Sequence, residues 1–361
     1  MDKKLMSLSM SGDKKYLYQQ KNLQPLLNEL PNYDGNKWLK KSLKTLGKIV
    51  KKNQIDVLEW KILTATLKDL EKGFRIFSDY RHYRKITIFG SARTPVDTLE
   101  YNLAKDFAKE VTELGFMVLT GAGGGIMAAG NEGATSKNSF GLNIKLPFEQ
   151  YANSFIKDDS KLINFKYFFT RKLFFLKESD AIALFPGGFG TQDEAFETIT
   201  LCQTGRQPPI PLVLIDKPDG NYWQSWHNYI CDHLLKDGYI QPEDTALYTI
   251  TDNVNHACKV IQEFYRVYHS CRYVKDLFVM RLNYDLTPNQ IEQLNENFKD
   301  ILMTGKIEKM PTPKKDKREI PHLPSIGFYL QPRKFSRLYQ MINLINTLPC
   351  EDSAYCPPQY R

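Results

Sequence analysis

The sequence predicts an α/β protein built on a doubly wound parallel sheet, with a helical N-terminal segment and a small C-terminal β-α-β-α unit. Short apolar runs alternate with longer segments of helical periodicity through the middle of the chain, and glycine-rich turns follow several of these runs. Residues 181–185 of the expected strand 180–185 are apolar on both faces, which is typical of a parallel strand covered by helices on both sides. The length of 361 residues fits one large domain with appended segments.

The first part, residues 1–83, is expected to be helical. Within 38–52, apolar residues recur at helical spacing, so the many lysines there are interpreted as a solvated helix face rather than a nucleic-acid site. A second helix is expected over about 56–80. Its apolar seam, which needs a partner surface, consists of Leu63, Leu67, Leu70, Phe74 and Phe77.

The second part, residues 84–269, alternates strands and helices. The expected strands are 86–90, 116–120, 141–146, 180–185, 211–215 and about 247–250. The expected helices are about 98–113, 126–136, 171–178, 192–203, 223–235 and 254–268. Right-handed crossovers place the loops after the strands along one edge of the sheet, so the glycine motifs are expected to meet there.

The third part, residues 270–361, is expected to hold strands at 278–282 and 325–330 and helices at 287–303 and 334–347. The proline-rich and charged segment 304–324 is interpreted as a loop or linker. No activity follows from this part, and a regulatory or oligomerising role is expected for it.

The most informative segment is 185–194, where a buried strand leads into glycines and then a helix. Gly187, Gly188 and Gly190 allow a tight turn and a close approach to a ligand, and Thr191 opens a helix whose N-terminus favours an anion. Thr191 and Glu194 also have the spacing of a capping box, in which the glutamate only satisfies the helix start. A cap does not require three glycines, so a phosphate-bearing substrate is favoured.

A second glycine run, 121–125, permits a rival hypothesis. Residues 123–128 satisfy a Gly-x-Gly-x-x-Ala pattern between a strand and a helix, with Glu149 downstream, which would indicate a dinucleotide site. The run follows the second strand rather than the first, and a dehydrogenase would leave 186–194 unexplained. That hypothesis is therefore disfavoured.

Four motifs in order resemble the LONELY GUY (LOG) family, over about residues 86–268. The signature Pro-Gly-Gly-x-Gly-Thr-x-x-Glu stands at 186–194, fifteen residues after Arg171-Lys172. The other matching segments are 89–93, 121–127 with 131–134, and 146–149.

This resemblance implies a Rossmann-like phosphoribohydrolase that cleaves the N-glycosidic bond of a nucleoside 5'-monophosphate, either AMP or another purine nucleotide or a cytokinin riboside 5'-monophosphate. It implies catalytic roles for Arg171 and Glu194, no cofactor and no metal, and at least a homodimer. The implied substrate-binding residues are Gly90, Ser91, Gly124, Gly125, Glu149, Lys172, Gly187, Gly188, Phe189, Gly190, Thr191 and Thr200. A non-catalytic nucleotide or cofactor carrier is the alternative, although a carrier would not require the Arg171 and Glu194 pair.

Two further expectations concern the acids and the location. The helix N-terminus favours the ionised form of Glu194, whereas Glu197, one turn later, is expected to face solvent. The chain shows no apolar run of membrane-span length and no signal-peptide pattern, so a cytoplasmic location is expected. Its six cysteines are scattered without a zinc-type spacing, and its net charge of +8 would attract anionic nucleotides.

Overall fold

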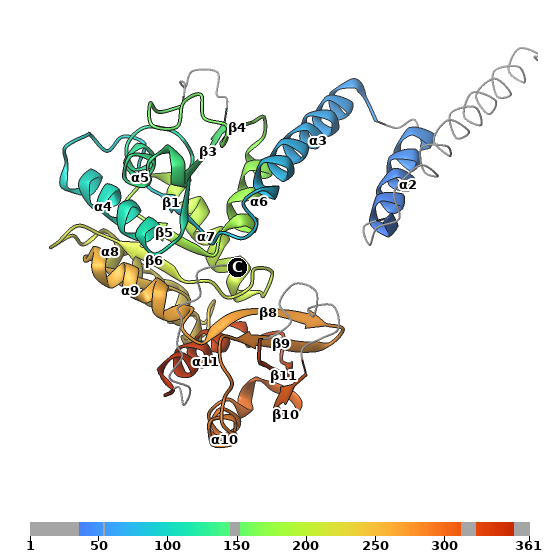
Figure 1. Ribbon diagram of the computed structural model, residues 1–361, viewed down its shortest axis with the longest axis vertical. Helices are drawn as coiled ribbons and strands as arrows, with labels where there is room; N and C mark the ends of the chain where they lie inside the picture. Colours follow the sequence, from blue (N-terminus) through green and yellow to red (C-terminus); the bar gives the residue numbers. More distant parts are fainter. Residues whose placement is uncertain (1–35, 53–54, 145–151, 312–322, 350–361) are drawn as a thin grey trace, which may run out of the picture. The chain divides into compact units, whose positions relative to one another are not determined.

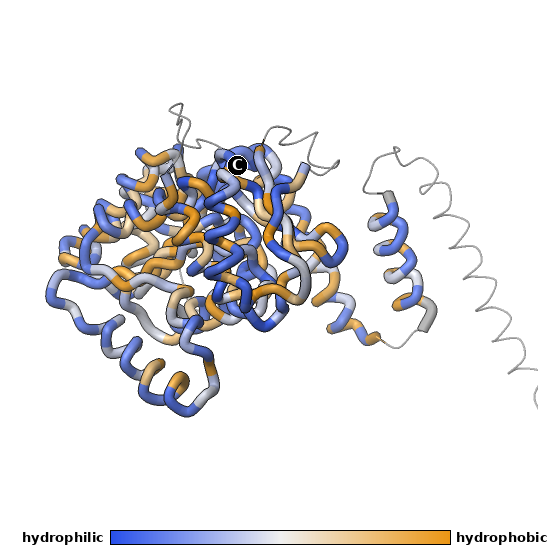
Figure 2. The backbone as a smooth tube through the Cα atoms, turned by 90° about the horizontal axis from the view of Figure 1, so that it is seen from below, coloured by the Kyte–Doolittle hydropathy of each residue, from blue (hydrophilic) through white to orange (hydrophobic). Residues whose placement is uncertain are grey.

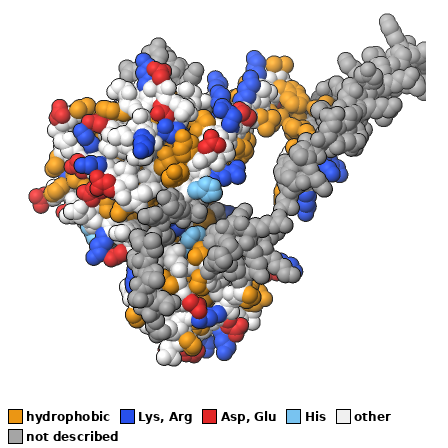
Figure 3. All heavy atoms as spheres, in the orientation of Figure 1, with side chains coloured by type: hydrophobic (Ala, Val, Ile, Leu, Met, Phe, Trp, Pro, Cys, Tyr) orange, Lys and Arg blue, Asp and Glu red, His pale blue; other side chains and the backbone are white. Residues whose placement is uncertain are grey.

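The computed structural model describes residues 36–52, 55–144, 152–311 and 323–349. The chain divides into two units, Met1–Leu67 and Lys68–Arg361. Helix α2 (Asn36–Lys52) lies in the first unit, and α3 (Val57–Ser78) runs from the first into the second. Hydrophobic side chains are exposed along α3 (Figure 3), and Leu67 and Phe74 of the predicted seam are each 47% exposed. Among the described helices, none is both long and apolar enough to cross a membrane.

The second unit contains the predicted doubly wound parallel sheet (Figure 1), with seven strands in the order β4-β3-β2-β1-β5-β6-β7. The strands are β1 (Lys85–Phe89), β2 (Met117–Thr120), β3 (Ser139–Ile144), β4 (Leu162–Phe165), β5 (Ala181–Leu184), β6 (Leu212–Ile215) and β7 (Thr249–Thr251). All neighbouring pairs are parallel. Strand β4 had not been predicted, because it is a short edge strand with alternating burial.

Helices connect these strands and cover the sheet. They are α4 (Leu99–Glu113), α5 (Ile126–Ala134), α6 (Phe168–Glu178), α7 (Phe189–Gln203), α8 (Tyr222–Tyr229) and α9 (Val254–Phe264). The central strands β1, β2, β5 and β6 are buried along their whole length, and hydrophobic segments of the tube run through the middle of this part in Figure 2. The chain builds β2 to β4 on one side of β1 and β5 to β7 on the other, so the order reverses between β1 and β5. Ligands of such sheets bind beyond the carboxyl ends of the strands at this switch point.

The C-terminal part differs from the expected β-α-β-α order. It forms a four-stranded antiparallel sheet, β10-β11-β9-β8, from β8 (Tyr268–Val274), β9 (Leu277–Leu282), β10 (Leu302–Met310) and β11 (Ser325–Leu330), with α10 (Pro288–Asn297) and α11 (Phe335–Thr347). The predicted linker was therefore wrong at 304–310, which belong to β10. Only Ile307 of this edge strand is buried, so the strand carries no alternating apolar pattern.

The C-terminal helix packs directly onto the elements of the parallel sheet. Gly205, with φ of +67°, lies so close to Phe335 that an added Cβ would be 2.2 Å from the ring. The buried hydroxyl of Tyr339 donates to the carbonyl of Ile210 at 3.1 Å. Ser336 donates to Asp244, which also accepts from Gln203 of α7 at 2.6 Å. These contacts join the C-terminal part to the same core.

Candidate functional site

Three glycine-rich loops meet at the switch point, as the sequence predicted. The backbone N–H of Ser91, after β1, donates to the carbonyl of Pro186, after β5, at 3.1 Å. The carbonyl of Ser91 accepts from the N–H of Ile126, at the start of α5, at 3.0 Å. The loops after β1, β2 and β5 therefore form one continuous surface at the carboxyl edge of the sheet.

Two of the glycines are required by this packing. Gly125 has φ of +58°, and an added Cβ would lie 2.2 Å from the carbonyl oxygen of Ser91. At Gly187 it would lie 2.2 Å from Oγ1 of Thr191 and 2.9 Å from the backbone nitrogen of Ser91. A side chain at either position would force the loops apart.

The other two glycines of the signature face open space. An added Cβ at Gly188 or Gly190 would meet nothing within 4 Å, although both stand at the first turn of α7. Backbone N–H groups at the start of a helix attract anions, and the absence of side chains lets a ligand approach them. We call the segment Gly187–Thr191 the glycine cradle.

A tyrosine that is not among the predicted site residues holds the cradle in place. Tyr222, at the start of α8, donates from its hydroxyl to the carbonyl of Gly187 at 2.6 Å. The same hydroxyl accepts from Nε2 of Gln192 on α7, also at 2.6 Å. Tyr222 lies 35 residues after Gly187 in the sequence, so only the fold brings it here.

Two asparagines fix the glycine run after β2. The side-chain amide of Asn153 donates to the carbonyl of Gly123 and to Oδ1 of Asn131, both at 3.0 Å. The fully buried Asn131 also accepts from the hydroxyl of Thr120 at 2.7 Å. Asn131 belongs to one of the matching motifs, and this network explains its presence structurally.

Glu194 lies one turn into α7 and is only 6% exposed. Its Oε2 is 3.1 Å from the ammonium nitrogen of Lys172. Burial raises the pKa of Glu194 above its ordinary value, while the charges of Lys172 and Arg171 oppose that rise. The net direction is upward, opposite to the direction expected from the helix N-terminus, because burial outweighs the charges of Lys172 and Arg171.

Lys172 of α6 faces three carboxylates on α7. Besides Glu194, its Nζ lies 3.0 Å from Oδ2 of Asp193 and 2.5 Å from Oε2 of Glu197. Burial lowers the pKa of Lys172, but hydrogen bonds to Glu197 and Asp193 raise it more, and the net direction is upward. Lys172 is therefore a fixed cation. Glu197 pairs with it instead of facing solvent, which corrects the sequence-based expectation.

Arg171 points toward the glycine run after β2. Its Nη1 lies 3.8 Å from where a Cβ of Gly121 would stand. The guanidinium lies over two aromatic rings, 5.1 Å from the centre of Phe168 and 5.5 Å from that of Phe175. Its charge lowers the pKa of Glu194. Arg171 and Lys172 thus place two positive charges near one buried carboxylate.

The start of α6, which carries both cations, is held by a residue a hundred positions earlier. The buried carboxylate of Asp69 on α3 accepts from the hydroxyl of Thr170 at 2.7 Å and from the backbone N–H of Lys166 at 2.9 Å. Tyr167, the N-cap residue of α6, provides no side-chain cap of its own. An added Cβ at Gly73, one turn after Asp69, would lie 2.2 Å from the ring of Phe174.

The remaining predicted site residues differ in how well they fit. Gly90 and Gly124 are packed against Ile126 and Ala92 in the converging loops. Phe189 is 97% exposed at the first position of α7. Thr200 is exposed, and six residues of helix turn it about 240° away from Glu194. Glu149 lies outside the described residues.

The fold and the site define a Rossmann-like α/β protein with a glycine cradle and an adjacent acid. Residues 127–261 match the family described as "Possible lysine decarboxylase". The chain is 30% identical over 95 residues to cytokinin riboside 5'-monophosphate phosphoribohydrolase LOG3 of Arabidopsis thaliana, covering 26% of this chain and 42% of that protein. It is 27% identical over 175 residues to the cytokinin riboside 5'-monophosphate phosphoribohydrolase of Mycobacterium tuberculosis, covering 46% of this chain and 88% of that protein. The central part of the chain is therefore similar in sequence to members of the LOG family.

The chain spans less than half the length of the plant relatives that it matches. Among solved structures, the molybdenum cofactor binding protein of Rippkaea orientalis shows 14% identity and a TM-score of 0.36, with 49% of this chain and 93% of that chain covered.

Proposed function

We propose that this protein hydrolyses the N-glycosidic bond of a nucleoside 5'-monophosphate to a free base and ribose 5-phosphate. The observation that carries the proposal is the buried Glu194 beside an open glycine cradle at the switch point of the sheet. The cradle suits the 5'-phosphate, and one helical turn separates it from the carboxylate. Purine nucleotides such as AMP and cytokinin riboside 5'-monophosphates share the ribose phosphate that this site would hold.

The proposed chemistry places positive charge on the anomeric carbon and negative charge on the departing base. The Glu194 carboxylate would stabilise the first and orient the attacking water. Arg171, whose guanidinium lies near the Gly121 loop, would offset charge on the phosphate or the leaving base. Lys172 would lower the pKa of Glu194 and so favour its ionised form, because it is the largest of the influences that oppose burial.

We further propose that the active form is a homo-oligomer. Phe168, Phe169 and Leu173 on α6 and Phe189 on α7 are large apolar side chains that are between 46% and 97% exposed beside the site. A second copy of the chain would cover such a surface. Light scattering of the purified protein should give at least twice the monomer mass, and a strictly monomeric active enzyme would contradict this.

A turnover screen tests the proposed reaction. AMP, GMP, IMP, CMP and isopentenyladenosine monophosphate should be incubated without added metal or cofactor, each beside its unphosphorylated nucleoside. Release of base from nucleotides but not from nucleosides is expected, because the cradle contributes binding energy only to a phosphorylated ribose. Equal rates on AMP and adenosine would refute the cradle assignment. Tight nucleotide binding without turnover would instead favour a carrier.

A further inference from the structure

Helix α2 (Asn36–Lys52; Figure 1) separates its lysines from its apolar residues. Successive residues of a helix are turned by about 100° around its axis. On this basis one side carries an apolar stripe of Leu39, Leu43, Leu46 and Val50, with Trp38 and Ile49 beside it. The other side carries a lysine face of Lys37, Lys40, Lys41, Lys44 and Lys48, and the two sets do not interleave around the axis.

The apolar stripe of α2 is not part of a core. Among residues 37–50, no side chain is buried, and none belongs to the hydrophobic core of the described chain. Trp38 is 61% exposed and Val50 is 44% exposed. An amphipathic helix of a soluble protein usually buries its apolar side, so this stripe is available to a partner.

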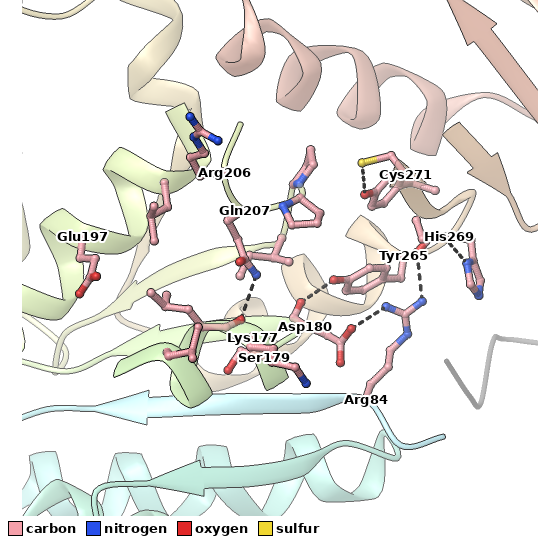
Figure 4. Close-up of a pocket in the computed structure, with 18 of the residues that line it drawn as sticks. Arg84, Lys177, Ser179, Asp180, Glu197, Arg206, Gln207, Tyr265, His269 and Cys271 are labelled. Carbon is pink, nitrogen blue, oxygen red and sulfur yellow. Dashed lines mark hydrogen bonds and ion pairs between the residues drawn. The ribbon is translucent and has the colours of Figure 1, made fainter. Parts of the chain in front are cut away.

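The positive charge of α2 is not balanced locally. The helix contains no aspartate or glutamate, and the lysine face forms no ion pair with any described residue. Charges in the second unit are paired instead, as Arg84 is with Asp180 at 3.9 Å in the cavity of Figure 4. Uncompensated positive charge along one helix attracts an anionic partner.

The polar side chains next to the apolar stripe are satisfied by the helix itself. Ser42, which lies between Trp38 and Leu46 around the axis, donates from its hydroxyl to the carbonyl of Trp38 at 3.0 Å. Thr45, at the border of the lysine face, donates in the same way to the carbonyl of Lys41 at 2.9 Å. This side of α2 can therefore leave water without leaving a hydroxyl donor unsatisfied.

Trp38 lies at the border between the two sides. The ammonium groups of Lys37 and Lys41 are 5.8 Å and 5.1 Å from the centre of its ring. Tryptophan favours the boundary between water and the apolar interior at a bilayer surface. Lysine side chains keep their hydrocarbon stems at such a boundary and extend their ammonium groups to the polar side.

Two kinds of anionic surface differ in what they offer to α2. A nucleic acid would pair with the lysine face but leave the apolar stripe in water. A bilayer with anionic lipids accepts both, because its acyl boundary takes the stripe and its phosphates attract the lysines. The bilayer also needs no groove that is shaped to fit the helix.

We propose that α2 binds the surface of a lipid bilayer that contains anionic phospholipids. The apolar stripe enters the acyl boundary, and the lysine face reaches the headgroups. The 17 residues of α2 make a helix about 25 Å long that lies along the surface instead of crossing it. This proposal concerns α2 alone, so it does not depend on the reaction proposed above.

Flotation of the full chain with lipid vesicles tests the proposal. One set of vesicles contains phosphatidylcholine alone, and the other also contains phosphatidylglycerol. The protein should bind the anionic vesicles about tenfold more tightly or better, because each lysine near the surface adds to the attraction. Raising the salt to about 0.5 M should weaken this binding by screening. Equal binding to both sets of vesicles, or binding to neither, would overturn the proposal.

Paired variants locate the binding on α2. Leu43→Gln with Leu46→Gln keeps the charge and a good helix former, and Lys44→Gln with Lys48→Gln keeps the apolar stripe. Each pair should weaken binding to the anionic vesicles about tenfold. Lys299→Gln with Lys306→Gln removes the same charge from exposed positions of the C-terminal part and should leave binding nearly unchanged. An equal loss in this control would show attraction to net charge alone and overturn the proposal.

Three further readouts separate the bilayer from other partners. Tryptophan emission should shift to shorter wavelength when anionic vesicles are added, and this shift should be lost in Trp38→Phe; a shift that persists there would overturn the proposed insertion. Binding to a short DNA duplex as tight as to the vesicles, and unchanged in Leu43→Gln with Leu46→Gln, would assign the lysine face to nucleic acid. A smaller mass by light scattering in that same variant, without vesicle binding by the wild type, would assign the apolar stripe to a second copy of the chain. Either result would overturn the proposal.

Discussion

Replacing Glu194 by glutamine should abolish most turnover while leaving the fold intact. Glutamine has nearly the same shape, and Lys172 keeps two carboxylate partners, Asp193 and Glu197, after the change. A carboxylate about 4 Å from the developing charge contributes roughly 4 kcal/mol at an effective dielectric constant near 20, which corresponds to about a thousand-fold in rate. Because Glu194 is buried, water would not compensate for the lost charge.

Asp193→Asn supplies the matched control for this variant. Asp193 contacts the same lysine from the same helix at 3.0 Å, but its side chain is 63% exposed. It should therefore lose less than about tenfold in kcat, since exposed ion pairs contribute only about 0–1 kcal/mol. Initial rates of base release under saturating AMP would be compared with thermal unfolding of each protein. A folded Glu194→Gln protein with near wild-type kcat would refute the assignment of Glu194.

Three other perturbations follow from the same geometry. Gly188→Ala should raise KM with little change in melting temperature, because the added Cβ would stand in open space where the phosphate is proposed to bind. Gly187→Ala should raise KM and also lower the melting temperature, because its Cβ would clash with Thr191. Equal KM values for Gly188→Ala and the wild type would contradict this. The raised pKa of Glu194 keeps it protonated up to a higher pH than an ordinary glutamate, so the loss of kcat on acidification should begin at a higher pH than usual. Lys172→Met should shift this acid limb of the pH–rate profile to still higher pH, because Lys172 lowers the pKa of Glu194. A shift to lower pH would contradict this coupling. A chain ending at residue 268 should unfold at lower temperature, since it would expose the surface under α11, and an unchanged melting curve would show that the packing contributes little.

The parts of the fold that the sequence predicted are those with strong periodic patterns. The buried strand β5 is apolar at every position, and α11 carries a clear helical apolar face. Strand β10 was missed because most of its side chains are exposed. The beginning of β8 was assigned to the preceding helix because Phe264, Tyr265, Val267 and Tyr268 extend the apolar pattern of that helix. Edge strands obtain their order from backbone pairing, which leaves little trace in the side chains.

The candidate site was predictable where backbone geometry demands particular residues. Gly125 and Gly187 stand where a side chain would clash, so their motifs are recognisable from sequence. The contacts of Lys172 could not be predicted from the sequence, because its three carboxylate partners lie on α7, which follows β5 in the chain. The direction of the pKa shift of Glu194 depends on its burial, which the helix position alone could not give.

The carboxylate of Asp69 makes the segment before β1 part of the structure that supports the proposed active site. A truncated chain designed to begin just before β1, near Arg84, would lack α3. It would leave the first turn of α6 without its cap at Thr170 and Lys166, and it would uncover the Phe174 ring that Gly73 lies against. Because α6 carries Arg171 and Lys172 on consecutive positions, any loosening of that turn would shift both cations together. The helix that looks like an appendage in the chain therefore sets the orientation of the charges that flank Glu194.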